Sequence, residues 1–162
     1  MTRTSFILNG EDVSIRREPW ARLVDVLRSD FGLMGTKPGC LAGKCGLCAV
    51  IFNGRVSHSC LIPAFRLQGS EVITIEGFSL TDEHQDVAGG FAEAGLGGCG
   101  YCDAGRAMAA GALLLGSRRP SREDILRAAD AVRCRCADPG SLAGGMEKAV
   151  EARMRRIYDR PS

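Results

Sequence analysis

The chain has 162 residues, 45% of them hydrophobic, and its 21 basic and 19 acidic residues leave a formal net charge of +2. This length suits one domain or two small ones, and the composition is that of a globular chain, which excludes a disordered one. So small a net charge gives no reason to expect a nucleic-acid partner or a membrane surface.

The first half of the chain is predicted to be mostly β-sheet. Short runs rich in β-branched and aromatic residues predict strands at residues 5–8, 13–15, 49–52, 56–57 and 72–75. Asn9-Gly10 and Asn53-Gly54 lie between such runs, and Asn-Gly is a strong signal for a two-residue hairpin turn. Apolar residues at helical spacing predict a single helix over residues 20–29, crossing the sheet.

The second half is predicted to be helical. Alanine- and leucine-rich segments with helical spacing occur at residues 86–94, 103–115, 122–132 and 142–157. Ser121, followed by acidic residues in the first turn, is the expected N-cap of the third of these helices. The change in pattern falls near residues 76–82. We therefore expect one domain over residues 1–77 and a second over residues 82–162.

The chain contains eight cysteines, and their chemistry depends on the compartment. The apolar stretch at residues 6–8 is shorter than the core of a signal peptide. Nowhere does the sequence reach the roughly 18 uninterrupted apolar residues that indicate a membrane-spanning helix. A cytoplasmic protein is therefore expected. Because the cytosol keeps thiols reduced, we expect the cysteines to bind metal rather than to form disulfides.

The first four cysteines have the spacing of an iron-sulfur loop. Cys40, Cys45 and Cys48 follow a Cys-x4-Cys-x2-Cys pattern, which is that of plant-type [2Fe-2S] ferredoxins. A two-residue turn in the following hairpin would place Ser59 opposite Cys48, so Cys60 would arrive beside it. The alternatives are a zinc site or reduced structural cysteines. Zinc sites favour paired Cys-x2-4-Cys motifs, and in this set only Cys45 and Cys48 form one.

The residues around this loop suit a negatively charged cluster. Gly39, Gly43 and Gly46 would let main-chain N–H groups approach the sulfur atoms. Lys37 and Lys44 would add positive charge nearby. Burial of a cluster requires such donors, because its charge otherwise loses the solvation that water supplies.

The other four cysteines lie in the helical half. Cys99 and Cys102 form a Cys-x2-Cys motif at a predicted helix start, where the helix dipole favours thiolate, and Cys134 and Cys136 follow between two predicted helices. By itself this set is also compatible with zinc or a redox-active thiol pair, although no βαβ pattern of thioredoxin type surrounds it. Nearby arginines either offset cluster charge or are exposed residues at helix ends: Arg106, Arg133 and Arg135.

Taken together, the two sets resemble the small iron-sulfur subunit of the molybdenum hydroxylases, a family that includes xanthine dehydrogenase, aldehyde oxidoreductase and carbon monoxide dehydrogenase. The similarity extends over nearly the whole chain. The segments that carry it are residues 35–40, 43–48, 59–61, 72–77, 99–102 and 134–136.

This resemblance implies an α+β fold in which a β-grasp ferredoxin-like domain precedes a four-helix bundle, with one [2Fe-2S] cluster in each. The implied ligands are Cys40, Cys45, Cys48 and Cys60 for the first cluster and Cys99, Cys102, Cys134 and Cys136 for the second. The implied role is electron transfer from a molybdopterin-binding large subunit to an FAD-binding subunit or another acceptor. The second cluster would be nearer molybdenum, and the chain would not be catalytic alone.

Three departures from the family pattern concern the surface that faces the large subunit. Gly98 stands where the family usually has a Gln that contacts the pterin, residues 103–105 read Asp-Ala-Gly in place of Thr-Pro-Gly, and the segment 132–138 differs except at its Cys-Arg-Cys core. All eight cysteines are retained. Two alternative functions stay open at this point: a ferredoxin-like carrier without a molybdenum partner, and a zinc-stapled interaction module.

Overall fold

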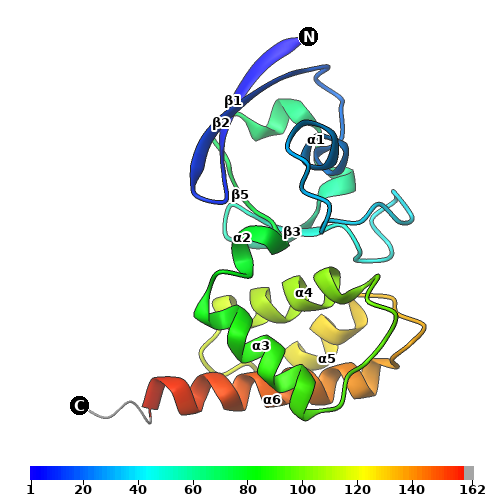
Figure 1. Ribbon diagram of the computed structural model, residues 1–162, viewed down its shortest axis with the longest axis vertical. Coiled ribbons are helices and arrows are strands. Elements are labelled where there is room, and N and C mark those ends of the chain that lie inside the picture. The colour runs from blue at the N-terminus through cyan, green and yellow to red at the C-terminus, as the bar shows by residue number, and fades with distance from the viewer. Residues whose placement is uncertain (159–162) are drawn as a thin grey trace.

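A five-stranded sheet forms the first half of the computed structural model, which describes residues 1–158 (Figure 1). The strands are β1 (Thr2–Leu8), β2 (Glu11–Arg17), β3 (Ala49–Phe52), β4 (Arg55–His58) and β5 (Glu71–Ile73). Their order in the sheet is β2-β1-β5-β3-β4, with β1 and β5 parallel and the other pairs antiparallel. The sheet predicted from β-branched and aromatic runs is confirmed.

Both predicted hairpin turns are present. Asn9 and Gly10 have φ angles of 52° and 87°, and Asn53 and Gly54 have φ angles of 49° and 77°. Two successive positive φ angles are the requirement of a type I′ turn, whose twist matches that of the flanking strands. The second turn pairs β3 with β4 so that Phe52 lies opposite Arg55. This register determines where the cysteines after β4 lie.

One helix, α1 (Leu23–Asp30), covers the sheet and encloses the first core. Leu23 and Leu27 of this helix and Val50 and Val72 of the sheet are all fully buried in one cluster. Burying an aliphatic side chain of this size contributes about 1.5–3 kcal/mol relative to leaving it exposed. Two short 3₁₀ turns, η1 (Ser59–Leu61) and η2 (Ala64–Leu67), connect β4 to β5.

The second half is helical, as predicted. Its helices are α2 (Ile75–Phe78), α3 (Asp82–Glu93), α4 (Asp103–Gly116), α5 (Arg122–Asp130) and α6 (Pro139–Tyr158). Ser121 caps α5 as expected, with its hydroxyl accepting from Asp124 N and the Asp124 carboxylate accepting from Ser121 N. Together the sheet and these helices make the α+β fold that the sequence predicted.

Several predicted boundaries are wrong. The helix expected from residue 20 begins at Leu23, and the helix expected from residue 142 begins at Pro139. The strand expected over 72–75 ends at Ile73, because the Asn9 side chain accepts a hydrogen bond from Thr74 N at 2.8 Å and the chain then turns into α2. The helix expected from residue 86 begins at Asp82, where Thr81 caps it. The helix expected to run to residue 132 ends at Asp130.

The two halves meet through α2 and α4 (Figure 1). Phe78 of α2 lies in a small buried cluster with Met108 of α4 and Ala49 and Ile51 of β3. A Cβ placed on Gly111 of α4 would lie 2.2 Å from Phe78 Cζ, so this helix position requires glycine. Among the described residues, no helix is long and apolar enough to cross a membrane.

Candidate metal centres

The hairpin β3-β4 brings the last cysteine of the first set to the others, as its register predicted. Ser59 N donates to Cys48 O at 3.1 Å, and the Ser59 hydroxyl donates to the same oxygen at 2.7 Å. Cys60 follows directly in η1. Cys48 and Cys60 are both buried, in a cluster that also contains Val24 of α1. Burial is the main cause that raises the pKa of the Cys48 thiol to about 11.

Cys40 and Cys45 lie on the exposed loop that precedes β3, and here the main chain supplies the polar contacts. Ala42 N and Lys44 N donate to Cys40 Sγ at 3.4 and 3.2 Å, and Cys40 N donates to Cys45 Sγ at 3.4 Å. The donations from Ala42 and Lys44 are the main reason that the pKa of Cys40 falls to about 6. N–H groups that stabilise a thiolate in this way also suit the sulfur atoms of a negatively charged cluster.

Close contacts explain the glycines of this loop. A Cβ on Gly39 would lie 2.8 Å from Cys45 Sγ, and Gly43 has a φ angle of 68° with its Cβ direction occupied by Leu61. The lysines contribute differently from each other. Lys44 donates its main-chain N–H to sulfur, whereas the Lys37 ammonium donates to the carbonyls of Met34 and Gly35. The loop therefore cradles sulfur with backbone groups.

The second set lies at the start of α4 and on the segment between α5 and α6. Cys102 is the N-cap residue of α4, as the predicted helix start implied, and its Sγ donates to Cys134 Sγ at 3.0 Å. Cys136 N donates to Cys134 Sγ at 3.3 Å. A Cβ on Gly98 would lie 3.3 Å from Cys136 Cβ, which places Cys136 beside the residue that precedes Cys99. Sequence positions that are more than thirty residues apart thus meet here.

The three arginines of this half differ in exposure. Arg133 and Arg135 are exposed, whereas the Arg106 side chain is buried and its Nη1 lies 3.9 Å from Cys102 Sγ. The thiol pKa of Cys102 is raised, chiefly by burial. Burial also acts on Cys134, but hydrogen bonds from Cys102, from main-chain N–H groups and from Arg106 outweigh it and lower its pKa.

Six of the eight thiols lie in pairs. The contacts join Cys40 with Cys45, Cys48 with Cys60, and Cys102 with Cys134, while Cys136 lies beside Gly98, the residue before Cys99. Within residues 1–158, no three Cys, His, Asp or Glu side chains lie close enough together to hold one metal ion. A [2Fe-2S] core takes four thiolates, two on each iron, so paired thiols with nearby N–H donors fit such a group.

Several contacts join the two cysteine sets, and sequence reasoning did not find them. Arg133 N donates to Cys45 O at 3.0 Å, and the Tyr101 hydroxyl donates to Pro38 O at 3.2 Å. A Cβ on Gly105 would lie 2.8 Å from Gly46 O, so α4 packs directly on the first loop. The only signal in the sequence was the presence of glycine at positions 46 and 105, because glycine lets two main chains approach closely.

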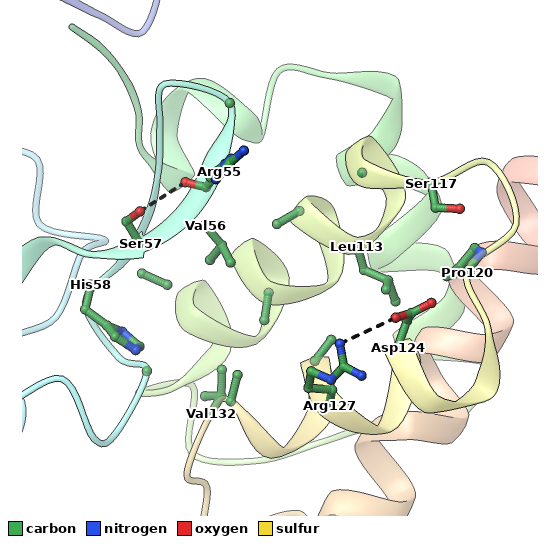
Figure 2. A pocket seen from close by; sticks show the side chains of 18 residues that line it. Arg55, Val56, Ser57, His58, Leu113, Ser117, Pro120, Asp124, Arg127 and Val132 are labelled. Carbon is green, nitrogen blue, oxygen red and sulfur yellow. Dashed lines mark hydrogen bonds and ion pairs between the residues drawn. The ribbon is translucent and has the colours of Figure 1, made fainter.

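A cavity of about 630 Å³ lies between β4 and the helices α4 and α5 (Figure 2). Val56 faces it from the sheet side, and Leu113 and Val132 face it from the helical side. Arg127 and Asp124 form an ion pair at its rim, with an N–O distance of 3.8 Å. None of the eight cysteines lines this cavity, so it is separate from both candidate metal centres.

Comparison with known proteins gives both halves a family. Residues 6–74 match the 2Fe-2S iron-sulfur cluster binding domain, and residues 74–147 match the [2Fe-2S] binding domain. The chain is 41% identical over 144 residues to the nicotinate dehydrogenase small FeS subunit of Eubacterium barkeri, covering 89% of this chain and 92% of that protein.

Solved structures agree with these matches. The fold resembles a chain of quinoline 2-oxidoreductase from Pseudomonas putida 86, with a TM-score of 0.81 and 31% identity over 95% of this chain and 96% of that one. It also resembles part of the aldehyde oxidoreductase from Desulfovibrio desulfuricans, with a TM-score of 0.84 and 32% identity. In that case 96% of this chain matches 17% of the larger one.

Proposed function

The chain belongs to the small [2Fe-2S] subunits of the molybdenum hydroxylases, and from this membership we propose which residues carry its electrons and between which partners. Members of this group are electron-transfer subunits of multi-subunit oxidoreductases, and this chain has their two 2Fe-2S domains. The proposed domain limits are residues 1–77 and 82–162, of which the last four lie outside the described residues.

The proposed ligands are the two sets of four thiols. Cys40 and Cys45 would hold one iron of the first cluster, and Cys48 and Cys60 the other. In the helical domain, Cys102 and Cys134 would share one iron because their sulfur atoms are 3.0 Å apart. Cys99 and Cys136 would then share the second. Each cluster, when bound, supplies a centre that accepts and releases one electron.

The observation that supports electron transfer through this chain is the direct contact between the two sets. The hydrogen bond from Arg133 N to Cys45 O joins the residue before one proposed ligand to the carbonyl of another. The Tyr101 hydroxyl, between Cys99 and Cys102, reaches the loop that carries Cys40. These contacts would keep the two proposed cluster sites close together, as a relay between two partners requires.

Each set also has an exposed edge that a partner could approach. Cys40 is exposed in the sheet domain, and Cys99 and Cys136 are exposed in the helical domain. We propose that the helical domain faces a molybdopterin-binding large subunit and that the sheet domain faces an FAD-binding subunit or another acceptor. The hydroxylation chemistry belongs to the large subunit. The reduced thiols that the ligands require are consistent with a cytoplasmic location.

Purification from the native cell tests this partnership. A tag on the genomic copy of this chain should recover a complex that contains molybdenum and a pterin, and FAD if the acceptor is a flavin subunit. Metal analysis and absorbance of the released cofactors would measure all three. Recovery of the chain alone, with both clusters but without molybdenum, would contradict the proposal and favour a ferredoxin-like carrier, an alternative that the Gly98 departure supports.

A further inference from the structure

Arg106 is the largest of the fully buried side chains, with 2% of its surface exposed. It lies one turn into α4, and its guanidinium contacts few compensating groups. Nη1 is 3.3 Å from Asp103 Oδ1 and 3.9 Å from Cys102 Sγ, while Cζ lies 5.7 Å from the centre of the Phe91 ring. The Nε atom is buried without a hydrogen-bond partner. A buried cation of this kind is costly unless a negative group faces it.

Asp103 alone is a weak counter-ion for this cation. Its side chain is 59% exposed, so water screens the attraction between the carboxylate and the guanidinium. The other groups near this cation are the sulfur of Cys102, to which Nη1 donates at 3.9 Å, and that of Cys134, which lies 3.0 Å from Cys102 Sγ. Four thiolates and two bridging sulfides together carry more negative charge than two ferric ions neutralise, so an oxidised [2Fe-2S] cluster is negatively charged. A cluster on these thiols would supply the counter-charge that Arg106 lacks.

We propose that Arg106 sets the reduction potential of the helical-domain cluster by placing a buried positive charge against its sulfur ligands. Reduction adds one electron and therefore one negative charge to the cluster. A cation held in a site of low dielectric constant stabilises the reduced form more than the oxidised form, which raises the potential. This inference rests on the ligands proposed above.

The sheet domain lacks a matching cation among its described contacts. Its thiols receive main-chain N–H groups, and the Lys37 ammonium donates to carbonyl oxygens instead. Gly98 adds to the difference, because a Cβ there would lie 3.5 Å from Arg106 Nη1. The guanidinium thus occupies space beside a position that carries no side chain. Arg106 acts through its charge on the ligand sulfurs. It makes the reduction potential of the helical-domain cluster higher than it would be without the cation, and the sheet-domain cluster has no such contribution.

A redox titration of the full chain, followed by low-temperature electron paramagnetic resonance, tests the proposal with Arg106→Gln. At a fixed ambient potential, the ratio of reduced to oxidised helical-domain cluster should fall about tenfold, which corresponds to about 59 mV for one electron. The signal of the sheet-domain cluster should not move. Arg135→Gln is the matched control, because it removes the same charge from an exposed position between two proposed ligands and should shift the ratio less.

A second variant decides the matter if Arg106→Gln fails to hold its cluster. Arg106→Met also removes the charge, and its apolar side chain suits the buried position beside Phe91, so the helical-domain ratio should fall as in Arg106→Gln. An unchanged potential in either variant with an intact cluster, or an equal shift of both signals, would overturn the proposal. The wild-type chain distinguishes a failure of the Arg106 proposal from a failure of the ligand assignment. Two signals in the wild-type chain establish two clusters, whatever the variants show.

Discussion

The two halves of the molecule hold their cysteines by different means. In the sheet half, main-chain N–H groups of Ala42 and Lys44 point at Cys40. In the helical half, Cys102 occupies the N-cap position of α4, and the buried Arg106 guanidinium donates to its sulfur. A loop that uses main-chain donors depends on backbone geometry, whereas a helix start that uses a side-chain cation depends on one residue. Similar cofactors can thus be stabilised by elements with different sensitivities to substitution.

Removal of one thiol from each half is the strongest way to test whether the two centres are independent. Cys48→Ser should remove about half of the bound iron together with the signal of the sheet-half cluster, because a hydroxyl is a poor substitute for a thiolate. Cys102→Ser should remove the other signal. Electron paramagnetic resonance of the reduced chain measures both. Loss of both signals from either variant, in a chain that stays folded, would show that the centres are not two separate sites.

Gly46 tests how far the halves depend on each other. Its φ angle is 74°, and a Cβ there would lie 2.2 Å from Ala131 O across the contact between the two sets. Gly46→Ala should therefore lower the free energy of unfolding by about 3 kcal/mol, from the left-handed backbone and the steric overlap together.

Gly54→Ala is the control for this substitution. Gly54 has a φ angle of 77° but no atom within 4 Å of its Cβ direction, so only the backbone cost of about 1 kcal/mol applies. Urea unfolding followed by circular dichroism compares the two variants. Equal losses would mean that the close approach between the halves contributes nothing to stability.

The two halves also differ in their ion pairs, for which we expect smaller losses in the free energy of unfolding. Arg156, near the end of α6, pairs with the nearly buried Asp86 of α3 at 2.8 Å and also contacts Asp82. Arg156→Gln should cost about 2 kcal/mol, less than a fully buried pair because the arginine is partly exposed. The Arg17–Asp30 pair of the sheet half is more exposed, so Arg17→Gln should cost less than Arg156→Gln in the same unfolding experiment. A larger cost for Arg17→Gln would reverse the comparison.

Helix capping gives the smallest expected difference. Ser121 caps α5 through its side chain, whereas Arg22, the N-cap residue of α1, makes no side-chain cap. Ser121→Ala should cost about 1 kcal/mol, and Arg22→Ala should lose no cap.

The pH dependence of this effect has a definite sign. Hydrogen bonds from the Ser121 side chain and main chain lower the pKa of Asp124 in the folded chain. The stabilisation from this carboxylate is present above its unfolded pKa and is lost as the pH falls through its folded pKa. The difference between wild type and Ser121→Ala should therefore shrink in acid, as unfolding at several pH values would measure. A difference that grows in acid would contradict the role of the ionised carboxylate.

The sequence predicted the parts of the site that depend on local rules. The Asn53-Gly54 turn determines the hairpin register, and so the meeting of Cys48 with Cys60 could be derived by counting residues. The helix start at Cys102 followed from the alanine-rich segment after it. Local rules did not reveal that Arg106 is buried. Helical spacing alone does not indicate which face of α4 packs on the first loop.

Long-range contacts account for the remaining differences between prediction and structure. The bond from Arg133 N to Cys45 O joins positions 88 residues apart, and no periodicity in either segment encodes it. The end of β5 likewise depends on Asn9, which lies in the turn between β1 and β2. Such contacts become visible only when the two halves are placed against each other.

The central claim is that these eight thiols hold two [2Fe-2S] clusters. Iron and acid-labile sulfide per chain, measured together with electron paramagnetic resonance of the dithionite-reduced protein, tests it most directly. The account predicts about four irons, about four sulfides and two distinct rhombic signals. Bound zinc with no paramagnetic signal would contradict it and leave the zinc-stapled module as the better description.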